Sequence, residues 1–249
     1  IIEDGQTIDT DIIRDIAADN IGALIWSKSM EMNDMEKPDF LKNAMRNLSI
    51  PVITMEKYGF DCPGVDILFD YEKGGYMATR HLIECGHRRI GCVAGKQSFH
   101  VTMQRLNGYK KALEESGISY DPDLVYFGDY TMESGYEAFS YILGQKVTAI
   151  FSMNDEMAFG IYRAARLYGV SIPEDISIIG FDNVPFADVM QVPLTTIGVP
   201  VIEMGKKLGE KVVDLIDNKE KLKEREEILY TPRLLVRGST KSIPPVTVI

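Results

Sequence analysis

Cysteine, histidine and clustered basic residues are all scarce in this chain of 249 residues. The three cysteines, Cys62, Cys85 and Cys92, are odd in number and form no C-x-x-C pair, and the three histidines are scattered. A structural zinc site needs four such ligands brought together. We therefore expect reduced, partly buried thiols, no metal site and no cofactor.

Basic residues are outnumbered, with 27 Lys and Arg against 37 Asp and Glu, which gives a formal net charge of −10. Clustered Lys and Arg grip phosphate backbones, so this segment alone is a poor candidate for nucleic-acid binding. No apolar run is long enough to span a membrane, and no secretory signal opens the chain. The composition therefore predicts a cytoplasmic protein with no membrane partner.

Strands and helices are expected to alternate along the chain, which predicts βαβ units and parallel sheets. Helices are expected from Asp9 or Thr10, from Pro38, and over 72–85, 102–116, 132–144, 156–168 and 201–217, with a short one near Pro185 to Met190. Strands are expected at 22–26, 51–55, 67–69, 89–94, 124–127, 148–151, 176–180, 227–230 and 234–236.

The strand expected at Ile176 to Gly180 is followed, at its carboxyl end, by Phe181, Asp182 and Asn183. Open parallel sheets bind ligands beyond the carboxyl ends of their strands. A hydrogen-bonding acid there, without metal ligands nearby, favours a receptor for a small polar molecule. Because no Ser-His-Asp order or cofactor fingerprint is present, we do not expect an enzyme.

Several short motifs then occur in a characteristic order. They are G-G-Y-M-A (74–78), G-H-R-R-I (86–90), R-L-N-G-Y (105–109), G-D-Y…E-S-G-Y (128–136), T-A-I-F…N-D-E-M-A-F-G (148–160), V-S-I-P-E-D-I-S-I-I-G-F-D-N (170–183), P-L-T-T-I (193–197) and L-V-R-G-S-T (235–240). In this order they resemble the effector-binding core of LacI/GalR-type transcriptional regulators, from about Asp66 to Thr240; residues 1–65 match only in element order.

The resemblance implies an α/β fold of two Rossmann-like parallel-sheet subdomains, similar to type I periplasmic binding proteins, joined by three crossovers. The N-terminal subdomain would comprise 1–69 plus 199–228, and the C-terminal one 70–198 plus 229–243, with 244–249 as a tail. The family's first strand and helix, and its DNA-binding head, have no counterpart here. We therefore expect the N-terminal subdomain to be truncated at its start.

Two charged residues are implied as the principal ligand contacts. Arg105 matches the family's ligand-clamping arginine; the alternative is a surface arginine paired with Glu115 or Asp129. Asp182 would accept hydrogen bonds from ligand hydroxyls and pair with Arg105, unless it serves only as a turn or cap acid.

The resemblance also implies a ligand-binding role for several other residues, and most of them have an alternative structural role. Asn154 binds ligand or caps helix 156–168. Tyr130 stacks on the ligand or fills a turn as a half-buried wedge. Asp70 and Tyr71 are ligand contacts or hinge residues, and the pocket-lining positions are Phe99, Val101 and Val201.

The implied function is a ligand-responsive regulatory domain. A small-molecule effector, with a sugar or sugar derivative favoured over a purine, would bind in the cleft between the subdomains and change operator DNA affinity through the absent head. A homodimer would form through helix 156–168 and Val184 to Gln191 of the C-terminal subdomain, together with a surface on the N-terminal subdomain. The alternatives are a sugar-binding protein of a membrane transport system, or a ligand sensor domain of another signalling protein.

Overall fold

The computed structural model describes residues 21–27, 45–46, 50–60, 62–218 and 225–244. The helices expected near Asp9 and Pro38, and most of the predicted tail, lie outside the described residues. The chain divides into two compact units, one of residues 1–69 with 200–230 and one of residues 70–199 with 231–249. They are called unit 1 and unit 2.

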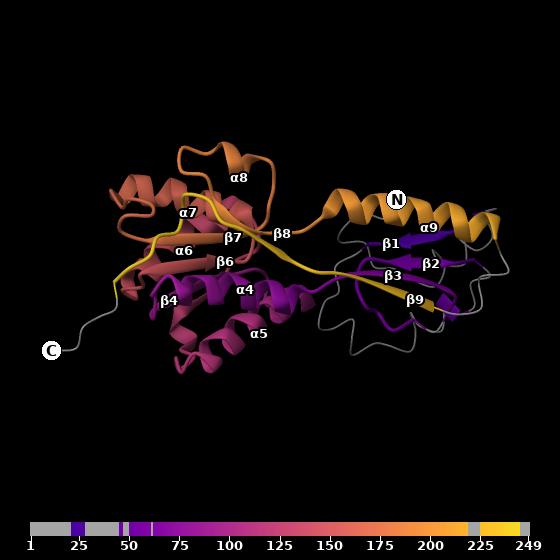
Figure 1. Cartoon of the computed structure of the whole chain (residues 1–249), viewed down its shortest axis with the longest axis horizontal. Coiled ribbons are helices and arrows are strands. Elements are labelled where there is room, and N and C mark those ends of the chain that lie inside the picture. Colours follow the sequence, from indigo (N-terminus) through magenta and orange to yellow (C-terminus); the bar gives the residue numbers. More distant parts are fainter. Residues whose placement is uncertain (1–20, 28–44, 47–49, 61, 219–224, 245–249) are drawn as a thin grey trace. The chain divides into compact units, whose positions relative to one another are not determined.

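Unit 1 contains a four-stranded sheet in the order β1-β2-β3-β9, all parallel. The strands are β1 (Leu24–Trp26), β2 (Val52–Thr54), β3 (Gly64–Phe69) and β9 (Arg225–Tyr230), and helix α9 (Val201–Asp217) runs along the sheet (Figure 1). An ion pair ties β9 to β3, because Arg225 Nε lies 2.9 Å from Asp66 Oδ2 and the two side chains are only 14% and 3% exposed.

Unit 2 contains a six-stranded sheet in the order β10-β8-β7-β6-β4-β5. Its strands are β4 (Ile90–Ala94), β5 (Val125–Phe127), β6 (Ala149–Ser152), β7 (Ser177–Asp182), β8 (Thr195–Gly198) and β10 (Arg233–Leu235). All neighbours are parallel except the edge pair β8 and β10. The predicted α/β class with parallel sheets is confirmed, with one antiparallel edge strand added.

Helices cover both faces of the unit 2 sheet (Figure 1). One face carries α4 (Tyr71–Glu84) and α5 (His100–Glu115), and the other carries α6 (Met132–Gly144) and α7 (Asp155–Tyr168). A short 3-10 turn, η1 (Pro122–Leu124), precedes β5, and α8 (Phe186–Val189) follows β7. The sheet is therefore buried on both sides, which explains its nearly continuous apolar strands.

The expected helices and strands among the described residues are all present, with ends shifted by a few residues. Two differences concern unit 2. The motif 193–197 was not predicted as a strand, but Thr195–Gly198 forms β8 in the interior of the sheet. Helix α5 begins at His100, two residues before the predicted start at 102.

Glycine lets the backbones of α4 and α5 touch. A Cβ at Gly75 would lie 2.1 Å from the carbonyl oxygen of Arg105, and one at Gly108 would lie 2.0 Å from that of Glu72. No side chain fits at such distances, so the crossing depends on both glycines. The close crossing fixes where α5 presents the side chain of Arg105.

The segment that follows β9 returns to unit 2 and completes it. Ser239 Oγ donates to the carbonyl oxygen of Ile178 and accepts from the N–H of Thr195, which joins the returning segment to β7 and β8. His87 is buried and lies within hydrogen-bond distance of the Lys241 carbonyl, Thr148 and Ser177.

Among the described residues no helix is long and apolar enough to cross a bilayer. Within the same residues, His, Cys, Asp and Glu form no group that could hold a metal ion. Cys62, Cys85 and Cys92 form no disulfide there.

Candidate functional site

The carboxyl edge of the unit 2 sheet gathers the polar residues that follow its strands. Gly95 follows β4, Tyr130 lies three residues beyond β5, Asn154 comes shortly after β6, and Asp182 ends β7. The strand order turns at β4, because β5 lies on one side of it and β6 on the other. Such a switch point is where open α/β sheets bind ligands.

Arg105 lies at the centre of this edge, where α5 buries it to 6% exposure. Its Nη1 donates to the carbonyl oxygen of Met153. Its Nη2 lies 3.4 Å from Asp182 Oδ1, a long separation for a charged hydrogen bond. Among the described residues its Nε has no hydrogen-bond partner. A buried donor without a partner is costly, so this guanidinium is suited to meet an oxygen acceptor.

Asp182 is the acceptor beside that guanidinium. Its side chain is 33% exposed against 7% for Arg105, so the carboxylate is the more accessible member of the pair. Burial raises the pKa of Asp182, and the positive charge of Arg105 partly opposes the rise. The predicted pairing with Arg105 is present, but it leaves acceptor capacity on the carboxylate.

Aromatic rings surround the guanidinium. Its central carbon lies 4.0 Å from the ring centroid of Phe181, 4.9 Å from that of Tyr71 and 5.7 Å from that of Tyr130. Phe99 stacks on Tyr130 at a centroid distance of 6.3 Å. Cation–π attraction therefore helps to hold Arg105 in place, and the rings form an apolar wall around it.

Tyr130 is fixed by contacts on both its ring and its backbone. Its φ of +73° is unusual for a residue with a side chain. Its hydroxyl lies 2.7 Å from Thr102 Oγ1, and its carbonyl accepts from Asn154 Nδ2 at 2.8 Å. Both hydrogen bonds hold the ring in one place beside Arg105.

Two predicted ligand residues are helix caps. Asn154 Oδ1 accepts the N–H of Met157 at 2.9 Å, so Asn154 caps α7 while its amide nitrogen serves Tyr130. Asp70 caps α4 by accepting the N–H of Lys73 at 2.9 Å. The capping interpretation of Asn154 is thus observed, whereas the cap at Asp70 was not predicted. Direct ligand contact by these two residues stays a prediction.

The pocket-lining predictions divide into three cases. Phe99 is half-buried and lies beside Tyr130. Val101 is only 8% exposed, so it offers little surface to a ligand. Val201 belongs to unit 1, where it begins α9 and is 64% exposed; its ligand contact stays a prediction.

Sequence reasoning placed Phe181 at a strand end without giving it a role, and it overlooked Thr102. Phe181 is fully buried beside the guanidinium, and a Cβ at Gly74 would lie 2.6 Å from its ring. Gly74, in the first turn of α4, was the available signal, since helices disfavour glycine unless something must come close. Thr102 could have been found from its spacing, one helical turn before Arg105.

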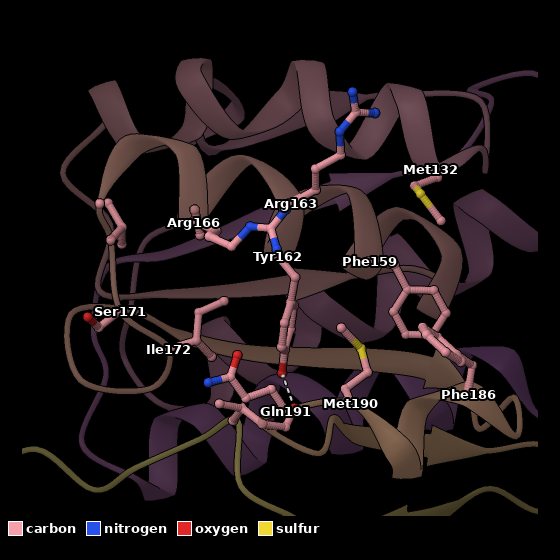
Figure 2. A pocket seen from close by; sticks show the side chains of 14 residues that line it. Met132, Phe159, Tyr162, Arg163, Arg166, Ser171, Ile172, Phe186, Met190 and Gln191 are labelled. Carbon is pink, nitrogen blue, oxygen red and sulfur yellow. Dashed lines mark hydrogen bonds between the residues drawn. The ribbon is translucent and has the colours of Figure 1, made fainter.

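A separate groove of about 630 Å³ lies along the outer side of α7. Figure 2 shows Phe159 beside Phe186 at one end, and Tyr162, whose hydroxyl donates to the carbonyl of Val192 at 3.1 Å, in the middle. Arg105 and Asp182 are not among its lining residues. The groove coincides with the predicted dimer surface, helix 156–168 and Val184 to Gln191.

Comparison with known proteins gives a consistent result. A family model described as "Periplasmic binding protein-like domain" matches residues 79–240. The chain is 39% identical over 199 residues to the HTH-type transcriptional repressor PurR of Pasteurella multocida, which covers 78% of this chain and 58% of that protein. The chain spans between 52% and 61% of the length of the curated relatives it matches.

Solved structures agree with the sequence comparison. A regulatory protein of the LacI family from Chloroflexus aggregans is 31% identical, with a TM-score of 0.76 over 92% of this chain and 81% of its own. A LacI family transcriptional regulator from Enterococcus faecium, solved with bound ribose, is 28% identical, with a TM-score of 0.77 over 94% of this chain and 85% of its own.

Proposed function

Since the chain belongs to the LacI family of transcriptional regulators and covers its effector-binding core, we propose that it binds a sugar or sugar derivative at the carboxyl edge of the unit 2 sheet. The supporting observation is the loosely paired Arg105 and Asp182, one offering an unused buried donor and the other an accessible acceptor. Neighbouring hydroxyls of a sugar supply one acceptor and one donor, which matches this pair.

The aromatic wall supports the same ligand class. Sugars combine polar rims with apolar C–H faces, and the rings of Tyr71 and Tyr130 lie within 6 Å of the guanidinium carbon. A purine is the second candidate effector, because relatives named PurR are among the most similar proteins and an aromatic wall also suits a planar base.

The rest of the function concerns the whole regulator. Effector binding would change the affinity for operator DNA, which a DNA-binding head outside this segment would contact. The two affinities are then linked reciprocally. Such a regulator acts in the cytoplasm, and the domain itself performs no catalysis.

Homodimerisation through the α7–α8 surface is part of the proposal. Phe186 and Val189 are 57% and 71% exposed on α8, next to the groove on α7. Exposed apolar side chains around a groove are typical of protein interfaces. A symmetric pair of these surfaces would give the two-fold arrangement that a palindromic operator requires.

A thermal-shift screen of pentoses, hexoses, disaccharides, phosphosugars and purines tests the effector class. A ligand present at 100 times its dissociation constant adds about 2.7 kcal/mol of stability, which is a visible shift. Calorimetry with each hit then compares the wild type with Arg105→Ala, Asp182→Ala and the control Lys111→Ala, an exposed residue of the same helix.

We expect at least about tenfold weaker binding in the first two variants, because each loses a charged hydrogen-bonding group, and no change in the control. Hits confined to purines would replace the sugar proposal with its alternative. Unchanged affinity in both site variants would place the effector elsewhere.

A further inference from the structure

Asp155 is a buried acid that the sequence presents only as the start of a helix. It is the first residue of α7 and is 0% exposed. Its Oδ1 accepts from the hydroxyl of Thr196 at 2.7 Å, and its Oδ2 accepts from the N–H of Val184 at 2.9 Å. A Cβ at Gly180 would lie 2.2 Å from Oδ1, so this glycine leaves room for the carboxyl group. Asp155 therefore joins α7 to β8 and to the turn after β7.

That turn carries Asp182 in an unfavourable backbone conformation. Asp182 has a φ of +104° and Asn183 a φ of +59°. Positive φ values at residues with side chains persist only where the surroundings enforce them. Arg237 Nη2 donates to Asn183 Oδ1 at 2.8 Å on one side of the turn. The bond from Val184 N–H to Asp155 holds the turn two residues after Asp182.

We propose that Asp155 is a positioning residue of the effector site, which fixes the turn presenting Asp182 and transmits its own charge state to that carboxylate. Both oxygens of Asp155 are engaged by the protein, so it acts on an effector only through Asp182. This inference rests on the proposed function solely in taking Asp182 as an effector contact.

Two titratable groups act electrostatically on Asp155. Asp182 adds like charge, and Tyr162, on the same helix, adds another negative charge if it ionises. The positive charge of Arg105 acts on Asp182, and Arg237 engages Asn183 and Asp188. Burial raises the pKa of Asp155 to about 7, hydrogen bonds with Thr196, Val184 and Asn183 oppose the rise, and the charge of Asp182 adds to it. Both protonation states are therefore populated near neutral pH.

The neutral acid can keep the turn in place. Once protonated at Oδ1, Asp155 donates to the hydroxyl of Thr196, which can accept as well as donate, while Oδ2 still accepts from Val184. Protonation thus changes the charge beside Asp182 but not the hydrogen-bonded framework. Asp155→Asn reproduces the neutral form, because its amide can make both contacts, whereas Asp155→Ala removes both.

The test uses the full chain without ligand. NMR follows the carboxyl carbon of Asp182 from pH 4 to 9 and the hydrogen exchange of the Val184 amide, in the wild type, Asp155→Asn, Asp155→Ala and the control Glu156→Gln, whose side chain is exposed next to Asp155. In the wild type we expect the Asp182 carbon signal to show a second inflection near pH 7, because Asp155 ionises beside it there. In Asp155→Asn this inflection should be absent, and the Val184 amide should stay protected.

In Asp155→Ala we expect Val184 to exchange at least about tenfold faster, since its acceptor is lost. The control should match the wild type in both measurements. Absence of the second Asp182 inflection from the wild type, its persistence in Asp155→Asn, or unchanged Val184 exchange in Asp155→Ala would overturn the proposal. If Asp155→Ala does not fold, the Asp155→Asn titration decides alone. Because no ligand is present, failure here is distinct from failure of effector binding, which Asp182→Ala tests.

Discussion

The α-carbon of Gly95 lies against the ring of Tyr130, so closely that a Cβ at residue 95 would be 2.0 Å from ring carbon Cζ. The loop after β4 and the loop after β5 are thereby fitted to each other at the edge that carries Arg105. No side chain larger than hydrogen is compatible with the present position of the ring.

Gly95→Ala should therefore displace Tyr130 from its place beside Arg105. We expect a stability loss of about 1–3 kcal/mol, which is typical of overpacking, and effector binding at least about tenfold weaker. Urea denaturation and calorimetry with the effector found by screening measure the two effects. Gly144→Ala is the matched control, since nothing lies within 4 Å of a Cβ there. Equal affinity in the two variants would remove Tyr130 from the site.

The ionisation of Asp155 should make unit 2 less stable as the pH rises. Its pKa in the folded state is raised from 3.8 to about 7, so folding favours the protonated acid. The stabilising contribution is complete below pH 4 and is lost as the pH rises to 7, with a slope of at most about 1.4 kcal/mol per pH unit. Asp155→Asn does not titrate and should lack this decline.

Urea denaturation followed by circular dichroism at pH 5 and pH 8 checks this expectation. Burial lowers the pKa of His81 and of His87, which disfavours the folded state at low pH. Those contributions are the same in both proteins and cancel in the difference. A difference between wild type and Asp155→Asn that does not change with pH would show that Asp155 remains in one protonation state.

Phe186→Asp should disrupt the proposed dimer. A charge at this exposed ring would be buried without a partner if two α7–α8 surfaces meet. Sedimentation equilibrium at micromolar concentration should show a monomer for this variant and a dimer for the wild type. Tyr141→Ser, a change at a 42% exposed ring on α6, is the control and should stay dimeric. A wild-type monomer, or a dimer in all three proteins, contradicts the proposed surface.

Arg225→Ala should destabilise unit 1, because it leaves the Asp66 carboxylate buried without its cation. Breaking such a pair costs about 3–5 kcal/mol. The single tryptophan of the chain, Trp26, lies buried in the unit 1 core, so its fluorescence during urea denaturation reports on this unit. Lys57→Ala breaks the exposed pair with Glu227 and should not measurably move the transition. Equal transitions in the two variants would contradict this expectation.

Much of the architecture could be predicted because helix and strand signals are local. Gly86 and Gly169 directly follow the predicted helices 72–85 and 156–168, and they have φ values of +97° and +69° at the ends of α4 and α7. Strand β8 was missed, because two threonines after Pro193 resemble a loop. Both are fully buried, and Asp155 and Ser239 satisfy them from more than forty positions away in the sequence.

The candidate site was likewise predictable only in part. The order of motifs indicated Arg105 and Asp182, and strand ends placed them at one edge of a sheet. The burial of Asp155 could not be foreseen, because a helix-starting acid is normally exposed. Only the approach of Gly180, Thr196 and Val184 makes it a buried group. Likewise, the dual use of Asn154 depends on where the Tyr130 carbonyl points.

The return of β10 and Ser239 to unit 2 has a consequence for how the protein is made. On a ribosome, β8 emerges well before β10, with the whole of α9 and β9 translated between them. Until β10 arrives, the edge of the nascent sheet offers unpaired N–H and C=O groups to any other strand nearby. Completion of this unit therefore waits for Arg233–Leu235 and Ser239, and translation stalled before Arg233 would leave an aggregation-prone intermediate for chaperones to bind.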